Sequence, residues 1–407
     1  MTQSVQSATS AQTKVEGWDE LIDTLRDLPS QLLATLPETM RNDPQLRQEV
    51  GRLALACLTG SALETLSADG DHPFFLPQLT MLTFGGQPNP DTLYRFASIT
   101  PGGVYRLRGT RGDCRLARIG EMSPYIKTAD GVVPTPIDSY HDINELTVDD
   151  QDRYDVILST ERPKGHAGDW WPLQPNTHRL LLRFVRGDWE NEREPTIAIE
   201  RVDVPAPYPR PSAAAMEQKL RGLSGATTFL AKLFIDKPEK LRAEGYINKF
   251  KVFDVSGMGG LAGQYYYETP YELKKGEALI IEAIAPKVFR YYSIMTTNET
   301  YDTIDWYNNQ SCLNDSQAQV DPDGVLRFVL SVDDPGVPNW LDVAGHYRGL
   351  VQGRWMECDT PTLPSARIVP LSEVRQHLHP ATGTVTPEER DAIVRKRRLA
   401  LQQRSLW

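Results

Sequence analysis

The sequence predicts a mainly β protein with helical additions: two antiparallel β-sandwich or jelly-roll-like domains, an N-terminal helical segment and a C-terminal helix. Three observations support this fold class. The chain has 407 residues, more than one ordinary domain of roughly 100–200 residues. Two long blocks hold short runs rich in β-branched and aromatic residues, separated by Gly, Pro and Asp, a pattern typical of sandwiches and barrels. Helical periodicity occurs before, between and after these blocks.

These changes of pattern divide the chain into six parts. The stretch "VPAPYPRPSAAA", at 204–215, is proline-rich and is the expected connection between the two β domains. The expected parts are a disordered lead-in at 1–17, a helical segment at 18–72, an N-terminal β domain at 73–204, a linker and helical pair at 205–250, a C-terminal β domain at 251–371 and a C-terminal helix at 372–407. Two β domains in tandem are compatible with distant copies of one domain.

The helices are predicted from apolar spacing and from their caps. Apolar side chains recur at helical intervals from Trp18 to Leu25. Asp43 is placed to cap the next helix, with Pro44 at its first position. Near the C-terminus, Thr386 and Glu389 have the spacing of a capping box.

The strands are predicted from β-branched and aromatic runs bounded by turn residues. In the first block these runs are "LYRFASI", "GVYRLRG", "CRLARIG", "YDVILST", "HRLLLRFV" and "PTIAIERVDV". In the second block they are "KVFDVS", "AGQYYYETPYEL", "EALIIEAIAP", "FRYYSIMT" and "GVLRFVLSV".

Charge and cysteine content exclude several classes of protein. The 44 basic and 54 acidic residues give a net charge of −10, which disfavours binding to nucleic acid, since that requires a basic surface. No run approaches the roughly 18 consecutive apolar residues of a membrane span. The four cysteines form no C-x-x-C pair and are expected to be reduced. We therefore expect a cytoplasmic protein that binds neither nucleic acid nor membranes.

The stretch 290–371 resembles the C-terminal module of a bacterial family known as domain of unknown function 1214. The matching features are an aromatic strand, a polar loop with Asn308, "DPDGVLRFVLS", "PNWL" and Arg354 before "P..P..R". The upstream "NPDTLYRFASI" looks like the Asn-x-Asp-Thr-x-Tyr strand of a partner module, domain of unknown function 1254. The resemblance implies two β-sandwich or jelly-roll-like domains and no established reaction.

The turn "NPDTLY" supplies the first candidate catalytic residues. Asp91 is a possible base or hydrogen-bond acceptor, and Tyr94 a possible donor to a hydroxyl or carbonyl group. In a regular strand these two side chains point to opposite faces, so they converge only if Asp91 belongs to a turn or bulge. The alternative is structural: Asn89 and Asp91 form Asx turns, and Tyr94 is a core aromatic.

A second group of candidates lies in "KGHAGDWWPLQPNTH", a stretch broken by Gly and Pro that we expect to be a loop. His166 is a candidate catalytic residue. Trp170 and Trp171 are candidates for stacking on a ligand, or they close the end of a sandwich. A metal site from the His and Asp side chains here would need three or four convergent ligands, and we expect none.

The C-terminal β domain supplies a third group. Asn and Trp near strand ends suit recognition of hydroxyl groups with stacking, and an arginine can hold a carboxylate in a bidentate manner. The alternative is that the amides tie loops together and the aromatic rings pack in the core. The candidate substrate-binding residues are Tyr292, Asn308, Asn339, Trp340 and Arg354.

Three functions fit these residues. We favour a cofactor-independent enzyme that uses general acid–base chemistry, of lyase, hydratase or hydrolase type. Its substrate would be a small, largely apolar metabolite with a hydroxyl or carbonyl group. The alternative is a carbohydrate- or small-ligand-binding β-sandwich protein without catalysis. The third is an assembly module that forms a homo-oligomer through the C-terminal helix. No cofactor is expected.

Overall fold

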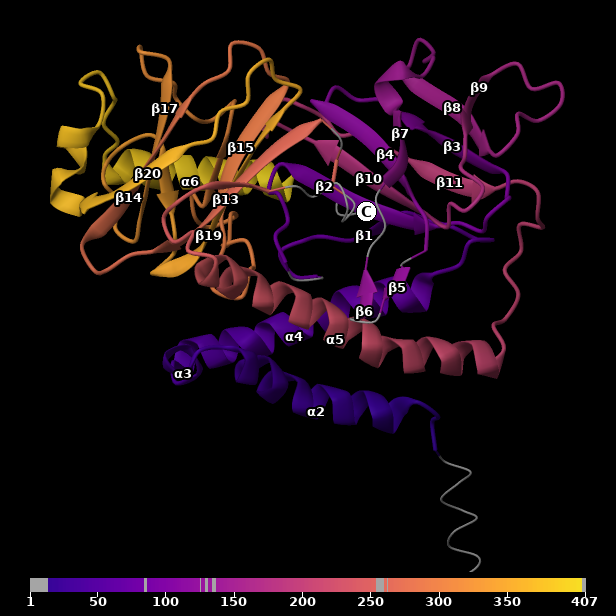
Figure 1. Ribbon diagram of the computed structural model, residues 1–407. Helices are drawn as coiled ribbons and strands as arrows, with labels where there is room; N and C mark the ends of the chain where they lie inside the picture. Colours follow the sequence, from indigo (N-terminus) through magenta and orange to yellow (C-terminus); the bar gives the residue numbers. More distant parts are fainter. Residues whose placement is uncertain are drawn as a thin grey trace, which may run out of the picture.

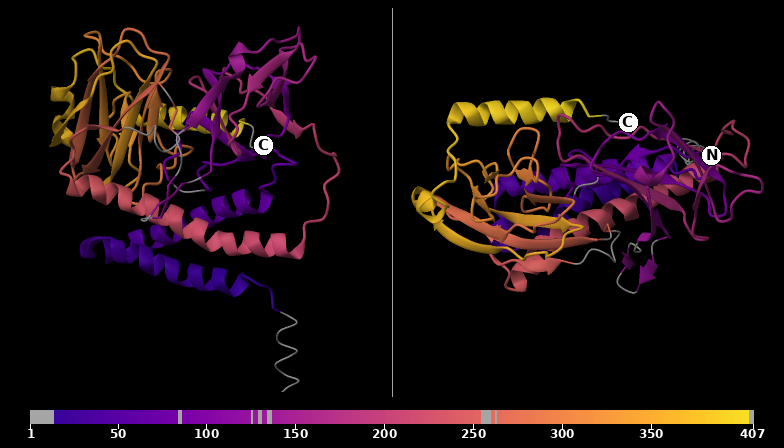
Figure 2. Two further views of the ribbon diagram at one scale, coloured as in Figure 1. Left: turned by 45° about the vertical axis from the view of Figure 1, so that its right-hand side comes forward. Right: turned by 90° about the horizontal axis from the view of Figure 1, so that it is seen from above.

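The computed structural model shows two β domains side by side on a layer of helices, with a further helix along one side (Figures 1 and 2). It describes residues 14–83, 86–124, 126–128, 131–133, 137–253, 260–261 and 263–404. The predicted fold class is confirmed: the structure is mainly β, with four main sheets and with helices in the N-terminal, middle and C-terminal parts. Most of the predicted lead-in, residues 1–13, lies outside the described residues.

The helical layer packs below both domains (Figure 1). Its helices are α2 (Trp18–Thr35), α3 (Glu38–Arg41), α4 (Pro44–Ser67) and α5 (Ala213–Ala243). Asp43 caps α4 as predicted, since its carboxylate accepts from the backbone N–H groups of Gln45 and Leu46. The sequence predicted a helical pair where the structure has the single helix α5. That helix continues through Pro238, which is buried, so tertiary packing overrides the helix-breaking preference of proline.

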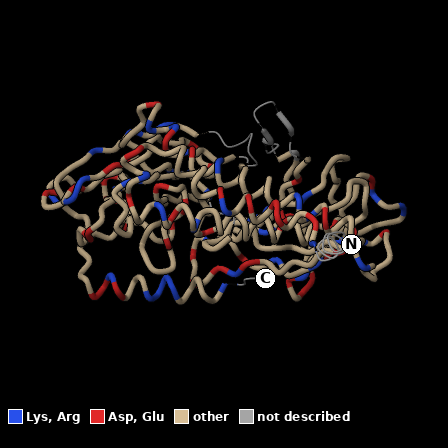
Figure 3. Tube along the Cα trace, turned by 90° about the horizontal axis from the view of Figure 1, so that it is seen from below, with Lys and Arg blue, Asp and Glu red and all other residues tan. Residues whose placement is uncertain are grey.

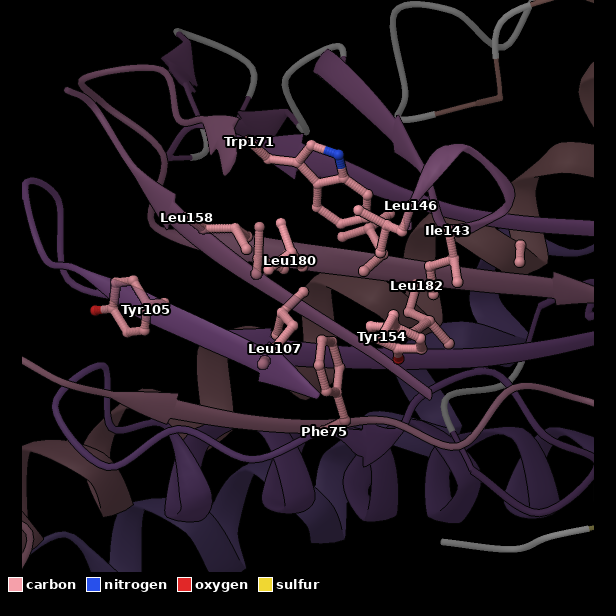
Figure 4. Close-up of a cluster of buried hydrophobic side chains, with 14 of the residues drawn as sticks. Phe75, Tyr105, Leu107, Ile143, Leu146, Tyr154, Leu158, Trp171, Leu180 and Leu182 are labelled. Carbon is pink, nitrogen blue, oxygen red and sulfur yellow. The ribbon is translucent and has the colours of Figure 1, made fainter. Parts of the chain in front are cut away.

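Domain 1, the N-terminal β domain, is a sandwich of two sheets. The five-stranded sheet has the order β1-β2-β10-β4-β7, and the four-stranded sheet has the order β11-β3-β8-β9. Its strands are β1 (Leu76–Pro77), β2 (Thr92–Ser98), β3 (Tyr105–Thr110), β4 (Leu116–Met122), β7 (Ile137–Asp142), β8 (Arg153–Ser159), β9 (Asp169–Pro172), β10 (Arg179–Val185) and β11 (Ala198–Arg201), with a separate hairpin of β5 (Ile126–Thr128) and β6 (Gly131–Val133). Side chains from both sheets form the core, among them Leu107, Leu180 and Leu182 (Figure 4).

Domain 2, the C-terminal β domain, is built in the same way. Its five-stranded sheet has the order β12-β13-β19-β15-β16, and its four-stranded sheet has the order β18-β17-β14-β20. Its strands are β12 (Lys251–Phe253), β13 (Gln264–Glu272), β14 (Glu277–Ile284), β15 (Tyr291–Thr296), β16 (Cys312–Asn314), β17 (Val325–Ser331), β18 (Trp340–Asp342), β19 (Arg348–Met356) and β20 (Ser365–Pro370). A separate core lies between these two sheets, around Trp355 and Phe328.

The two domains have one topology. If the β5–β6 hairpin is set aside, the strands of domain 2 taken in chain order occupy the same sheet positions as those of domain 1. In both domains the next-to-last strand lies at the centre of the five-stranded sheet, and one parallel pair, β8–β9 or β17–β18, ends the four-stranded sheet. The structure therefore has the arrangement expected of two copies of one domain.

The domains meet through the outward faces of their five-stranded sheets. Side chains alternate across a strand, so Leu180 and Leu182 of β10 enter the core of domain 1 while Val185 faces domain 2. The pair Leu116 and Val185 packs against the pair Tyr291 and Met356 in one buried cluster. These two cross-strand pairs occupy equivalent places in the two sheets, so the interface is roughly symmetric.

Helix α6 (Pro387–Gln402) runs along one side of the molecule from domain 2 towards domain 1 (Figure 2). Thr386 and Glu389 form its predicted capping box. The guanidinium of Arg397 lies 4.4 Å from the ring centroid of Trp189 in domain 1, and Arg404 donates to the carbonyl of Pro90 at 2.8 Å. The helix therefore joins both domains of its own chain, and oligomerisation through it stays a prediction.

Charges are spread over the whole molecule. Lys and Arg residues are interspersed with Asp and Glu residues along the trace in Figure 3. Within the described ranges, no helix combines the length and the apolar character needed to cross a bilayer.

Candidate functional site

A cavity of about 290 Å³ lies between the two β domains, and α5 forms one of its walls. Its other walls come from the outward faces of the two five-stranded sheets, through β2, β4, β10, β13 and β19. The described residues that line it are Gln78, Leu79, Gln87, Tyr94, Met122, Arg179, Leu181, Arg183, Phe229, Leu230, Leu233, Phe234, Lys237, Phe253, Gly260, Tyr266, Tyr301, Gln352 and Arg354. Sites between domains are common places for small-molecule binding.

Two equivalent tyrosine–arginine pairs line this cavity. Tyr94 on β2 lies directly opposite Arg183 on β10, with the guanidinium carbon 6.0 Å from the ring centroid. Tyr266 on β13 lies directly opposite Arg354 on β19, at 5.1 Å. The strands correspond between the domains, so each domain contributes the same pair to the shared cavity.

The cavity has an apolar wall and a basic wall. The apolar wall comes mainly from Phe229, Leu230, Leu233 and Phe234 of α5. The basic groups are Arg179, Arg183, Lys237 and Arg354, while no Asp or Glu is among the described lining residues. Such a combination favours a ligand that has an apolar body and a negative charge.

Arg179 and Lys237 are paired with carboxylates. Arg179 bonds to Glu64 of α4 at 2.5 Å, and Lys237 bonds to Glu268 of β13 at 2.9 Å. Arg179 also lies 4.4 Å over the ring of Phe96. These contacts fix the two cations at the edges of the cavity.

Arg354 is a buried cation of the cavity wall that has no carboxylate partner among the described residues. Arg354 is only 3% exposed to solvent. Its Nη2 atom donates to Gln352 Oε1 at 2.9 Å and contacts Met295 Sδ at 3.7 Å, while Nε has no partner in the described part of the chain. Burying a charge without a counterion costs free energy. The guanidinium of Arg354 is therefore suited to bind an anion.

The pKa of Arg354 is raised, so its guanidinium stays charged. Burial alone would lower this pKa, but the nearby Tyr266, Tyr291, Tyr94 and Asp91 raise it more, and it lies above its ordinary value. Burial raises the pKa of Tyr266 as well, so its phenol stays protonated near neutral pH and can donate a hydrogen bond.

Asp91 lies beside the cavity, in a buried hydrogen-bond network between the domains. Its carboxylate accepts from Tyr291 Oη at 2.5 Å, from Asn314 Nδ2 at 2.7 Å and from Trp189 Nε1 at 2.7 Å. Burial raises the pKa of Asp91, and these three donors partly offset that effect. Asn89 accepts the backbone N–H of Asp91 at 3.2 Å, so the predicted Asx turn is present. All three donors serve to hold the carboxylate in place.

Tyr94 and Arg354 are thus the two predicted site residues that the structure brings together in one cavity. The predicted catalytic pair does not converge: Tyr94 lines the cavity, whereas Asp91 is tied to domain 2 and to Trp189. The catalytic roles of both residues stay predictions.

The other candidates of domain 1 lie on its four-stranded sheet. The stretch expected to be a loop contains β9, which pairs with β8 in parallel. Trp171 is buried in the domain core and stacks on His141 with centroids 4.7 Å apart, while Trp170 donates to Ser159 Oγ at 3.0 Å. His166 contacts the carbonyl of Asp169 at 2.9 Å. None of these residues lines the interdomain cavity.

The remaining candidates of domain 2 also lie away from the cavity. Tyr292 is in the core of domain 2. Exposed Asn308 bonds to Asp305. Asn339 ties loops together through the carbonyls of Gln319 and Arg327. Trp340 packs in a smaller buried cluster of the same domain. These contacts match the structural alternative for each of them.

A larger groove of about 1120 Å³ lies on domain 1, near β9. Its polar groups are already engaged: Arg153 pairs with Asp149 at 2.7 Å, Arg108 pairs with Glu200, and Asp169 accepts from the backbone N–H of Thr147 at 2.7 Å. This groove therefore has fewer groups to offer a ligand than the interdomain cavity.

One cluster of potential metal ligands occurs within the described ranges. Glu49, Glu299 and His346 each bring one donor atom within 4.8 Å of the others. His346 Nδ1 already bonds to Glu299 at 2.8 Å, so the three side chains form an ion-paired link between α4 and domain 2.

The sequence did not identify Arg183, Tyr266, Gln352 and Lys237 as site residues. A signal was present for the two strands that hold the arginines: "LLLRFV" and "VQGRWM" both place an arginine before a core aromatic residue. Alignment of the two halves strand by strand would have paired Arg183 with Arg354. Lys237 lies on α5, and its place in the site depends on tertiary packing alone.

Fold and cavity together define a mainly β protein of two matching sandwich domains with a pocket between them. A crystal structure of an uncharacterized protein from Burkholderia cenocepacia has a similar fold. Its TM-score is 0.78 at 26% sequence identity, over 88% of this chain and 97% of that chain. The VPA0106 protein from Vibrio parahaemolyticus aligns over 79% of this chain and 99% of that chain, with 11% identity and a TM-score of 0.43.

No model of a known protein family matches the chain, and no curated protein matches it either. The resemblance to the two domains of unknown function therefore stays a prediction.

Proposed function

We propose that the protein binds a small amphipathic anion, such as a carboxylate with an apolar body, in the cavity between its two β domains. The main support for this proposal is the environment of Arg354. This residue is a buried cation that has no carboxylate partner among the described residues, and it faces an apolar wall. A ligand carboxylate would supply the missing counterion through charge-assisted hydrogen bonds.

The second tyrosine–arginine pair supports the same ligand class. Arg183 and Tyr94 also line the cavity, so both domains contribute an arginine and a tyrosine to its wall. The side chains of α5 would cover the apolar body and remove it from water, which stabilises the complex by roughly 25 cal/mol per Å² of buried apolar surface.

Acid–base catalysis is the second candidate function. Tyr94 and Tyr266 line the cavity, each with an arginine guanidinium near its ring. A phenol in such a place can donate a proton to a carbonyl oxygen or stabilise an oxyanion. The ligand would then be a substrate of the predicted kind, largely apolar and bearing a carbonyl or hydroxyl group.

The test is ligand binding to matched arginine variants. Hydrocinnamate, benzoate and a neutral amide of each are added to the wild type, and affinity is measured by calorimetry. Arg354→Met should weaken carboxylate binding by roughly ten- to a hundredfold, since charged hydrogen bonds contribute about 1.5–3 kcal/mol. Arg348→Met is the control, because Arg348 lies on the same strand but pairs with Glu272. Equal binding of acids and amides would contradict the proposal.

A further inference from the structure

The two domains differ at the pair of positions next to the tyrosine–arginine pairs, where Leu181 and Gln352 line the cavity while Phe96 and Glu268 are not among its lining residues. On β2 and β10, the pair next to Tyr94–Arg183 on the same faces is Phe96–Leu181. On β13 and β19, the pair next to Tyr266–Arg354 is Glu268–Gln352. The same place in the repeated fold is therefore apolar in domain 1 and polar in domain 2.

Glu268 is an unusual residue for such a place. It is completely buried, and burial raises the pKa of its carboxyl group. One carboxylate oxygen, Oε1, accepts from Lys237 at 2.9 Å. The other, Oε2, is buried and has no hydrogen-bond partner in the part of the chain that the structure describes. A buried acceptor without a hydrogen-bond partner costs free energy.

Domain 1 provides an internal control for this cost. Its equivalent residue, Phe96, fills the same place in the same topology, so the fold does not require an acid there. Lys237, which neutralises Glu268, is itself part of the cavity wall and lies 3.7 Å over the ring of Phe253. Gln352, opposite Glu268 on the next strand, also lines the cavity.

We infer that Glu268 and Gln352 form a polar subsite for a hydrogen-bond donor on the ligand, so that the natural ligand is an amphipathic carboxylate that also carries a hydroxyl or ammonium group. This inference rests on the proposed function. The donor group lies about 7 Å from the anionic head, since same-face neighbours on a strand are two residues, or about 7 Å, apart. On the domain 1 side of the cavity, the equivalent position is Leu181, which contacts only apolar groups of the ligand.

Three probes that share the 3-phenylpropanoate body and differ at the para position test the subsite: hydrocinnamate, para-hydroxyhydrocinnamate and para-(aminomethyl)hydrocinnamate. The last two distinguish a hydroxyl donor from an ammonium donor. Calorimetry with the wild type should show at least one of them binding roughly tenfold more tightly than hydrocinnamate, the expected gain from a hydrogen bond to a carboxylate. Glu268→Gln should lose this preference.

Two further variants keep the test decisive. Lys237→Met/Glu268→Gln removes both charges of the pair, so neither is left alone in the interior, and it should also lose the preference. Glu272→Gln, on the same strand but paired with Arg348, should retain it. Melting temperatures establish that each variant is folded.

The outcomes separate this inference from the proposed function. If none of the three probes binds to the wild type, both fail. If all three bind with equal affinity, the polar subsite is absent and the anion site stands. If a preference exists but persists in both Glu268 variants, then Glu268 is not its source and the inference is overturned.

Discussion

Tyr291 of domain 2 donates a hydrogen bond of 2.5 Å to the carboxylate of Asp91 in domain 1, and both side chains are fully buried. Asn314 and Trp189 donate to the same carboxylate. This buried carboxyl group is thus one of several links between the two sandwiches, together with the ion pairs Arg115–Asp315 and Arg118–Glu357. The site depends on these links because its walls come from both domains.

Removal of the Tyr291 hydroxyl should weaken the interface. Tyr291→Phe leaves the buried carboxylate with one donor fewer and removes the acceptor for Asn89 Nδ2, which lies at 2.9 Å. We expect a loss of about 1–3 kcal/mol in the free energy of unfolding, measured by urea denaturation. Tyr292→Phe is the matched control, since the Tyr292 hydroxyl is buried with no partner among the described residues, and its loss should not destabilise the protein. Equal effects of both substitutions would contradict this role of Asp91.

The internal repeat predicts equal roles for Tyr94 and Tyr266, which are far apart in the sequence. Tyr94→Phe and Tyr266→Phe should each weaken hydrocinnamate binding by roughly two- to tenfold, the range for loss of one neutral hydrogen bond. Melting temperatures should change little. If the cavity catalyses a reaction, the same variants should lower turnover more than affinity. A large effect from one tyrosine and none from the other would refute the equivalence of the two half-sites.

The predicted site residues His166 and Trp170 of domain 1 should not affect binding in the interdomain cavity. His166→Ala and Trp170→Ala remove side chains that lie by β9, away from that cavity. Affinity for hydrocinnamate should match the wild type in both. Loss of binding in either variant would move the site to the groove on domain 1.

Stability should depend on pH through Asp342, at the end of β18. Burial raises the pKa of this carboxyl from 3.8 to about 6. A raised carboxyl pKa means that the folded protein binds more protons than the unfolded one between these two values, so stability falls as pH rises from about 4 to 6. Its Oδ1 accepts from the backbone N–H of Ala344 at 2.7 Å, a bond that asparagine can also accept.

Asp342→Asn should therefore be more stable than the wild type at pH 7, by on the order of 1–3 kcal/mol, with the gain disappearing below pH 4. Urea denaturation at several pH values measures this difference. A variant whose stability relative to the wild type is independent of pH would show that Asp342 titrates normally.

The sequence predicted the fold class because its determinants are local. Alternating runs such as "LYRFASI" and "HRLLLRFV" became β2 and β10, and the caps at Asp43 and Thr386 start α4 and α6. It misplaced features that depend on tertiary contacts. Helix α5 continues through the buried Pro238, and β9 forms only because β8 lies beside it.

The site was predictable only in part for the same reason. Tyr94 and Arg354 carry chemistry that can be recognised in a sequence, but they are far apart along the chain and meet through the packing of the two domains. Asp91 was identified as a polar residue in a turn, and its partners Tyr291 and Asn314 come from domain 2. Knowledge of the repeated topology is what pairs Arg183 with Arg354.

A crystal structure of the protein with hydrocinnamate tests the central claim most directly. The carboxylate should lie within hydrogen-bond distance of Arg354, with its ring against the side chains of α5. A ligand bound elsewhere, or a cavity without ligand at saturating concentration, would contradict the assignment of this cavity as the anion site.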